Sequence, residues 1–97
     1  MPTRAFVYIL RCADGSLYTG YTIDLQRRLK QHQSGHGGKY TRAHRPVELV
    51  YSESYRTRRE AMRREIAIKR LPRAKKLALL QAAKPAGKKR GGLTAKK

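Results

Sequence analysis

The 97-residue sequence contains a single cysteine, no tryptophan and no long apolar run. Because Cys12 has no partner in the chain, an internal disulfide and a zinc site built from cysteines are both excluded. No apolar segment approaches the ~20 residues that a membrane-spanning helix needs. The first residues also lack the apolar stretch of a secretory signal peptide. We therefore expect a cytoplasmic protein without a membrane segment, for which association with the nucleoid is also open.

Acidic residues are also scarce. The chain has 24 Lys and Arg residues against 6 Asp and Glu residues, which gives a net charge of +18. The positive charge is concentrated after residue 55, where Glu60 and Glu65 are the only acids. A charge of this size and sign predicts a polyanionic partner, and nucleic acid is the first candidate.

The composition changes near residue 83. Residues 84–97 are rich in lysine, glycine and proline and contain one large apolar residue, Leu93. Such a segment buries too little surface to offset the entropy of ordering it, so a disordered basic tail is expected there. This tail is either an arm that binds phosphates or an end that only improves solubility. Residues 1–83 are expected to form the folded domain.

Three segments favour β-strands because β-branched and aromatic residues dominate them. The first two are residues 5–12 and 16–21, which the hairpin signal Asp14-Gly15 separates. The third strand is expected over residues 48–52.

Two further segments are predicted to be helices. One runs over residues 25–33 after a cap at Thr22 or Asp24. The other runs over residues 58–71, where Thr57 and Glu60 form a capping box and Pro72 ends the helix. A short additional helix is possible over residues 73–83. The order β-β-α-β-α predicts an α+β domain in which helices flank a three-stranded antiparallel sheet.

The first helix carries polar groups at the edge of its buried face. Leu25, Leu29 and His32 follow the i, i+4, i+7 spacing of an inward-facing stripe, and Arg28 lies beside them. Taken alone, His32 could be a buried histidine with satisfied hydrogen bonds. Arg28 could likewise be a surface residue with its stem along the core.

The second helix places a carboxylate among apolar residues. Glu65 falls within an arc formed by Ala61, Met62, Ile66 and Ile68. A carboxylate on an inward face is costly unless it is paired or binds a metal, so Glu65 is a candidate functional residue. The alternative is an i, i+4 ion pair with Lys69.

Tyrosine accounts for 6 of the aromatic residues. Tyr8 and Tyr18 lie in the two strands of the expected hairpin, where they could stand opposite each other. Alternation along the first strand places Phe6, Tyr8 and Leu10 on one face and the residues between them on the other. The alternative is that both tyrosines belong to the core, with their hydroxyls at its edge.

The small number of Asp and Glu residues also limits the kinds of catalytic site that the protein can form. A two-metal phosphodiesterase needs several carboxylates at one point, and the acids of this chain are scattered. A single Mg²⁺, held by one carboxylate, water and substrate phosphate, is more compatible with the sequence. The histidines do not have the compact spacing of a metal site.

Several short motifs together resemble those of the GIY-YIG nuclease family. They are Phe6-Val7-Tyr8, Tyr18-Thr19-Gly20, Asp24-Leu25 followed by Arg28 and His32, and Glu65 followed by Ile68-Lys69. The resemblance covers about residues 4–80. It is strongest to the small single-domain bacterial branch, the YhbQ-like proteins, which residues 38–42 and 46–51 also resemble.

The resemblance implies a role for each matching residue. Tyr8 matches the tyrosine that acts as general base or orients the attacking water, and Tyr18 the one that helps to position water and phosphate. Arg28 matches the arginine that contacts the scissile phosphate, and His32 a histidine that can shuttle a proton. Glu65 matches the glutamate that binds the metal, Mg²⁺ or Mn²⁺.

The sequence also departs from the family pattern. Phe6 stands where the first motif has a glycine, and Thr19 is in the middle of the second motif. Some family members have an asparagine late in the domain, whereas this chain has none. No second domain that would select a target is visible in these 97 residues.

These observations predict a Mg²⁺-dependent DNA endonuclease that prefers a DNA structure over a sequence and acts in repair or recombination. The alternatives are a non-catalytic module that binds DNA or RNA and a subunit that depends on an unidentified protein partner. The residues expected to contact nucleic acid are Gly20, Arg27, Lys39, Arg42, Arg63, Lys69 and Arg73.

Overall fold

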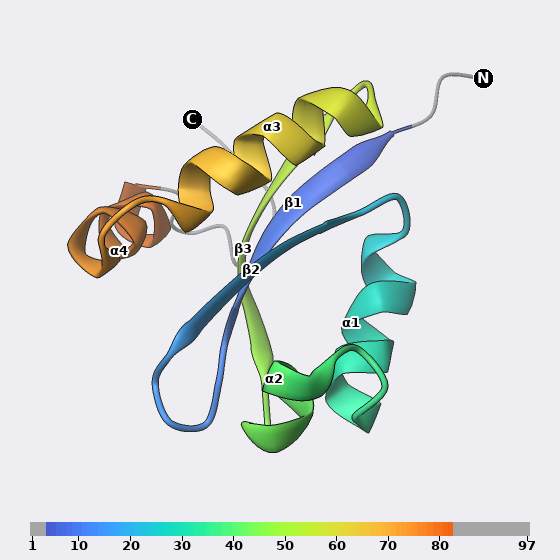
Figure 1. Ribbon diagram of the computed structural model, residues 1–97, viewed down its shortest axis with the longest axis vertical. Helices are drawn as coiled ribbons and strands as arrows, with labels where there is room; N and C mark the ends of the chain where they lie inside the picture. The colour runs from blue at the N-terminus through green and yellow to red at the C-terminus, as the bar shows by residue number, and fades with distance from the viewer. Residues whose placement is uncertain (1–3, 83–97) are drawn as a thin grey trace.

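The computed structural model describes residues 4–82, so the expected tail at residues 84–97 lies outside the described part of the chain. Four helices and three strands follow one another along residues 4–82 (Figure 1). They are β1 (Ala5–Arg11), β2 (Leu17–Thr22), α1 (Leu25–Ser34), α2 (Lys39–Ala43), β3 (Glu48–Tyr55), α3 (Arg58–Lys69) and α4 (Arg73–Ala82). None of the helices in this part of the chain is long and apolar enough to cross a membrane.

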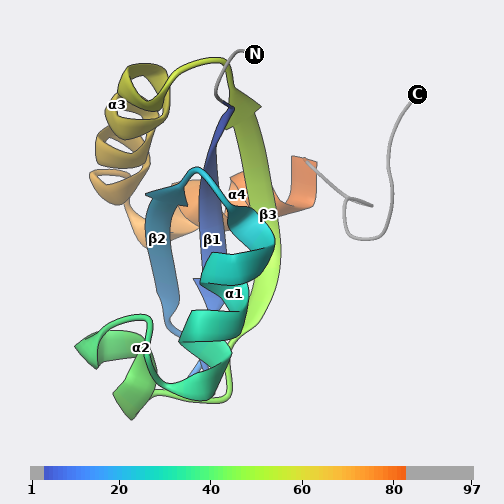
Figure 2. The ribbon, with the colours of Figure 1, turned by 90° about the vertical axis from the view of Figure 1, so that its right-hand side faces the viewer.

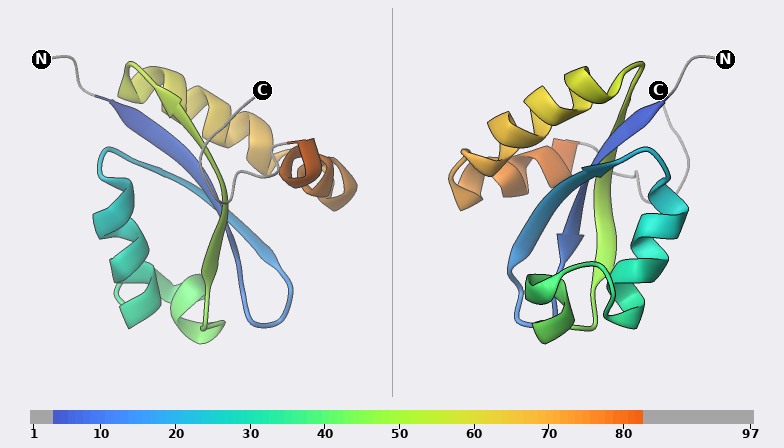
Figure 3. Two further views of the ribbon diagram at one scale, coloured as in Figure 1. Left: turned by 180° about the vertical axis from the view of Figure 1, so that it is seen from behind. Right: turned by 45° about the vertical axis from the view of Figure 1, so that its right-hand side comes forward.

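The strands form one antiparallel sheet in the order β2-β1-β3, with β1 in the centre. Helices cover both faces: α1 and α2 lie on one side, and α3 and α4 on the other (Figures 2 and 3). Because successive side chains of β1 point to opposite faces of the sheet, the core consists of one cluster on each face. Val7 and Ile9 pack with Ala61 and Ile68 of α3, whereas Tyr8 and Leu10 face α1. The predicted α+β architecture is confirmed.

Local signals in the sequence explain where most elements begin. Asp24 caps α1 by accepting a hydrogen bond from the backbone of Arg27. The capping box of Thr57 and Glu60 opens α3 as predicted. The additional helix is present as α4, while α3 ends at Lys69, two residues earlier than predicted.

Two elements differ from the prediction. Helix α2 was not expected, because it has only five residues and lacks a side-chain cap. Strand β3 continues three residues beyond Ser52, to Tyr55. In this extension, the Glu53 carboxylate accepts hydrogen bonds from Tyr51 and Tyr55 and from Nε and Nη2 of Arg64, the last two at 2.9 and 3.1 Å.

These partners explain how a carboxylate is tolerated against α3. Burial works to raise the pKa of Glu53. The hydrogen bonds from Arg64 and the two tyrosines outweigh it, so the pKa lies below its usual value. The compensated charge allows the polar end of β3 to stay in the sheet.

Candidate active site

The sheet brings Tyr8 and Tyr18 to the same face, the one covered by α1 and α2. They are diagonal neighbours and not opposite each other, because Tyr8 pairs with Gly20 and Tyr18 pairs with Leu10. Their ring centroids lie 6.5 Å apart, with 39° between the ring planes. The residue opposite Tyr8 is therefore the glycine of the second motif.

Gly20 leaves space for the Tyr8 ring inside the protein. A Cβ atom at this position would lie only 2.5 Å from the phenol oxygen of Tyr8. Gly20 is buried, and the ring of Tyr8 occupies the space above it. Contact between this residue and nucleic acid stays a prediction. The missing side chain allows the Tyr8 hydroxyl to reach the edge strand.

His32 is fully buried between α1, α2 and the sheet. Its Nε2 lies 2.8 Å from the Tyr8 hydroxyl, and its Nδ1 lies 2.8 Å from the Thr41 hydroxyl. Thr41 in turn donates to the Gly38 carbonyl at 3.4 Å. Thr41 Oγ1 therefore accepts from Nδ1–H, and Nε2 is left as the acceptor for the Tyr8 proton.

Burial, assisted by the nearby Arg28 charge, lowers the pKa of His32 to about 4. His32 is therefore neutral at pH 7, as the hydrogen-bond pattern requires. Burial also raises the pKa of Tyr8. Arg28 opposes this effect, but it does not cancel it. Tyr8 is therefore a protonated phenol in the free protein.

Arg28 lies one turn before His32 on α1 and is half-buried. Its guanidinium donates to Gln31 Oε1 at 3.0 Å and to the Gly37 carbonyl at 2.9 Å. Gly37 also lies directly against the imidazole, since a Cβ atom there would collide with Nδ1 of His32. The loop after α1 thus orients both Arg28 and His32.

Two supporting residues were not identified from the sequence, Gly37 and Thr41. The sequence predicts neither a helix nor a strand between residues 33 and 48, where both residues lie. A signal for Thr41 existed in the family-like segment 38–42. The sequence spacing between His32 and Thr41, however, did not indicate that the two side chains form a hydrogen bond.

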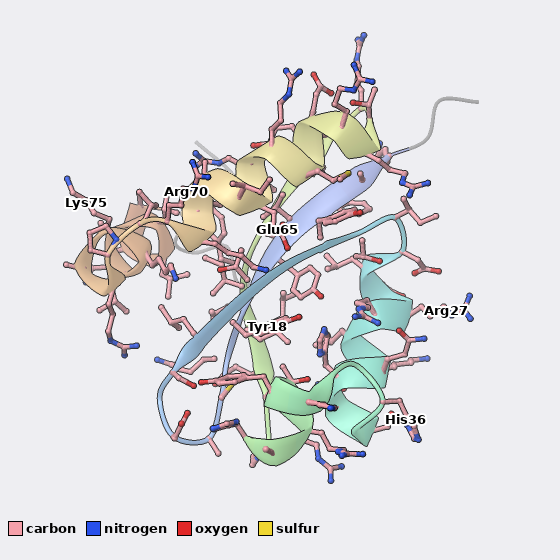
Figure 4. All side chains as sticks on the ribbon, viewed as in Figure 1. Tyr18, Arg27, His36, Glu65, Arg70 and Lys75 are labelled. Atoms are coloured by element: carbon pink, nitrogen blue, oxygen red, sulfur yellow. The ribbon has the colours of Figure 1, made fainter. Side chains whose placement is uncertain are left out.

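Glu65 comes from α3, on the opposite side of β2 from Tyr18 (Figure 4). Its side chain is only 16% exposed and forms an ion pair of 3.2 Å with Lys69. The i, i+4 pair that the sequence also allowed is therefore present. The carboxylate still lies close enough to raise the pKa of Tyr8 by its charge.

The predicted apolar arc around Glu65 is partly wrong. Ala61 and Ile68 are buried, but Met62 and Ile66 are 41% and 47% exposed. Residues 61, 65 and 68 follow the i, i+4, i+7 spacing, which turns this stripe to the sheet and the neighbouring apolar positions to solvent. Glu65 thus lies on the inner stripe, as expected, without all of its predicted neighbours.

A divalent metal at this site would have one protein carboxylate. Residues 4–82 contain no cluster of three or more His, Cys, Asp or Glu side chains that could hold a metal. The largely covered carboxylate of Glu65 nevertheless fits Mg²⁺, which commonly keeps several waters and binds through one or two carboxylates and substrate phosphates.

The remaining predicted contacts with nucleic acid are exposed basic side chains. Arg27 and Arg28 line a cavity of about 480 Å³ at the start of α1, together with Arg58 from α3. Neither Tyr8 nor Tyr18 lines this cavity. The exposed basic residues are Arg27, Lys39, Arg42, Arg63, Lys69 and Arg73.

Comparison with known proteins identifies the family. The model of the GIY-YIG catalytic domain matches residues 4–78, and the chain belongs to this family. This confirms the resemblance seen in the motifs. Membership indicates a nuclease-type function with a nucleic-acid substrate.

Relatives of the chain include bacterial proteins named UPF0213. The chain is 61% identical to a UPF0213 protein of Bacillus pumilus over 71 residues, which are 73% of this chain and 72% of that protein. It is 54% identical to a UPF0213 protein of Staphylococcus aureus (strain Mu3 / ATCC 700698) over 76 residues, 78% of this chain and 93% of the relative.

Two solved structures share the fold. The solution NMR structure of a UPF0213 protein from Bacillus halodurans matches with a TM-score of 0.57 and 48% identity, covering 86% of this chain and 89% of that one. The solution NMR structure of a protein from E. faecalis also has a TM-score of 0.57. It is 38% identical and covers 95% of this chain and 98% of the other.

Proposed function

We propose that this protein is an endonuclease that hydrolyses phosphodiester bonds in DNA with the help of one divalent metal, Mg²⁺ or Mn²⁺. The observation that carries the proposal is the hydrogen-bonded chain from Tyr8 through His32 to Thr41, with Arg28 beside it. A neutral, buried imidazole whose free lone pair faces a phenol is arranged to move a proton.

Arg28 binds the scissile phosphate in this proposal. Gln31 and Gly37 hold its guanidinium in one orientation, so little side-chain entropy is lost when a phosphate binds. A fixed positive charge also stabilises the negative charge that develops on the phosphate in the transition state.

Tyr8 and His32 take up the proton of the attacking water. The water oxygen forms the new bond to phosphorus as the bond between phosphorus and the leaving oxygen breaks. The water proton goes to the Tyr8 oxygen as the Tyr8 proton moves to Nε2 of His32, and the leaving oxygen departs with the electron pair of the broken bond and takes a proton from solvent. A bound phosphodiester adds negative charge near Arg28 and His32, which raises the low pKa of His32. Substrate binding therefore makes the histidine a better proton acceptor.

Glu65 would hold the metal, which supplies positive charge to the phosphate oxygens and to the leaving group. In the free protein, Lys69 forms an ion pair with the same carboxylate and places a positive charge where the metal would bind. The ring centroid of Tyr18 lies 5.3 Å from that of His32. In this proposal Tyr18 covers the side of the site next to β2 and helps to position the water.

The substrate is a DNA structure such as a nick, flap or branch, and the activity serves repair or recombination in the cytoplasm. The exposed basic residues supply affinity for phosphates but do not read a base sequence. The second candidate function is a DNA- or RNA-binding module without cleavage. The ion pair between Glu65 and Lys69 favours this alternative, because it leaves the carboxylate partnered in the absence of a metal.

A cleavage assay distinguishes the two functions. Supercoiled plasmid and a labelled branched DNA are incubated with the protein in Mg²⁺, in Mn²⁺ and in EDTA. The same assay includes Glu65→Ala and, as a control, Glu48→Ala, because Glu48 is an exposed carboxylate at the start of β3. We expect metal-dependent cleavage that is lost in Glu65→Ala and retained in Glu48→Ala.

A third variant tests the proton path. Tyr8→Phe keeps the ring that packs on Gly20 and removes the hydroxyl that reaches His32. It should bind DNA like the wild type and fail to cleave it. Tight binding without cleavage by all four proteins would instead support the binding module or a missing partner.

A further inference from the structure

Three aromatic rings continue from the candidate active site to the surface. Tyr18 stacks on Tyr40 of α2 with centroids 6.1 Å apart and 16° between the planes. Tyr40 stacks on His44 at 4.1 Å and 17°. We call Tyr18, Tyr40 and His44 the ring stack. Its inner end lies beside His32, and Tyr40 is 42% exposed.

The turn between β1 and β2 fixes the ring stack in place. The Tyr40 hydroxyl donates to Ser16 Oγ at 2.6 Å, and Ser16 donates to Asp14 at 2.6 Å. His44 Nδ1–H donates to the Tyr40 carbonyl at 2.6 Å, and its Nε2 lies 3.6 Å from Asp14. The polar atoms of the Tyr40 and His44 rings are therefore held by the protein, and these two rings are ordered before any ligand arrives.

Basic side chains flank the ring stack. Tyr40 and His44 are four residues apart and share one side of α2. Lys39 and Arg42 lie on another side, where they line a hollow of about 280 Å³ together with Gly35, His36 and Gly38. Exposed aromatic rings next to basic side chains are the combination that binds unpaired nucleotides, with the base on the rings and the phosphate on the cations.

We propose that the ring stack binds an unpaired nucleobase, with Lys39 and Arg42 on the adjacent backbone phosphate. The inference rests on the proposed function only for the class of substrate, a nucleic acid. The faces of a paired base inside a duplex are covered by its neighbours and cannot join the stack. The protein therefore selects DNA that contains unpaired nucleotides, such as flaps and gaps.

Binding in EDTA tests the proposal independently of cleavage. A labelled single-stranded DNA and a blunt duplex of the same sequence are titrated with wild type, Tyr40→Phe and Tyr40→Leu, and binding is followed by fluorescence anisotropy. Tyr40→Phe keeps the ring and loses only the bond to Ser16, so it should bind like the wild type. Tyr40→Leu should weaken binding of the single strand about tenfold and leave duplex binding within about twofold.

A fluorescent base reports the stacking itself. Single strands that carry 2-aminopurine should lose emission on binding wild type or Tyr40→Phe and keep it on binding Tyr40→Leu. Circular dichroism and thermal melting check that the variants fold. If Tyr40→Leu does not fold, His44→Ala replaces it, since this change leaves the bond between Tyr40 and Ser16 in place.

Equal losses for single strand and duplex in Tyr40→Leu would overturn the proposal, as would unchanged 2-aminopurine emission in the wild type. A wild type that does not prefer single strands would also overturn it, even if the protein cleaves duplex DNA. Conversely, a protein that cleaves nothing and still shows the Tyr40-dependent preference would refute the proposed nuclease function and support the ring stack.

Discussion

A decrease in pH from about 6.5 to about 4 is expected to destabilise this protein through one side chain, His32. In the unfolded chain the imidazole has its ordinary pKa of 6.5, and burial, assisted by Arg28, lowers the pKa to about 4 in the folded protein. Between these values the unfolded state binds a proton that the folded state does not. The contribution to stability is therefore complete above pH 6.5 and falls as the pH decreases.

The size of the effect follows from the same two values. One pKa unit corresponds to about 1.4 kcal/mol, so the interval between pH 6.5 and pH 4 is worth about 3 kcal/mol of unfolding free energy. This is a large part of the 5–15 kcal/mol typical of small domains. His32 should therefore dominate the pH dependence in this range.

Urea denaturation of wild type and His32→Gln at several pH values measures this contribution. The variant should be less stable at pH 7, because it loses a buried hydrogen-bond partner of Tyr8 and Thr41. The difference between the two proteins should shrink by about 3 kcal/mol as the pH falls to 4. Glu53 also contributes at the acidic end, but it is the same in both proteins and cancels in the difference.

His36→Gln serves as the control, since His36 is exposed and, within residues 4–82, its ring bonds only to Ser34. Its unfolding free energy is measured at the same pH values, which separates the effect of losing His32 from the effect of losing an exposed histidine. Titration of the 3 histidines by NMR provides a direct measurement. A His32 ring that titrates above pH 6, or a constant difference between wild type and His32→Gln, would refute this reasoning.

The sequence predicted the elements that local signals specify. The capping box of Thr57, the hairpin turn at Asp14-Gly15 and the alternation along β1 each act over a few residues, and each appears in the structure. The inward positions of His32 and Glu65 followed from helical periodicity for the same reason. Both residues stood out in the sequence, because a charged or imidazole side chain is unusual on the apolar stripe of a helix.

The features that the sequence did not predict depend on contacts between distant segments. Strand β3 continues past Ser52 because Arg64, eleven positions after Glu53, neutralises the carboxylate. Helix α2 is stabilised by Thr41, which bonds to His32, and by Tyr40, which bonds to Ser16. Pairing of these side chains becomes visible only once the sheet brings them together.

Two further predictions test this packing. Gly20→Ala should displace the Tyr8 ring, because the new Cβ would lie 2.5 Å from its hydroxyl oxygen, and should reduce stability by about 1–3 kcal/mol and impair cleavage. An unchanged urea midpoint would contradict the close contact. Arg64→Leu should cost about 1–3 kcal/mol, because it leaves the Glu53 carboxylate, only 16% exposed, without its cation. Replacing both partners, with Glu53→Gln as the second change, should recover part of this loss, since no unpaired charge then remains. Strict additivity of the two single changes in urea denaturation would show that the pair does not interact.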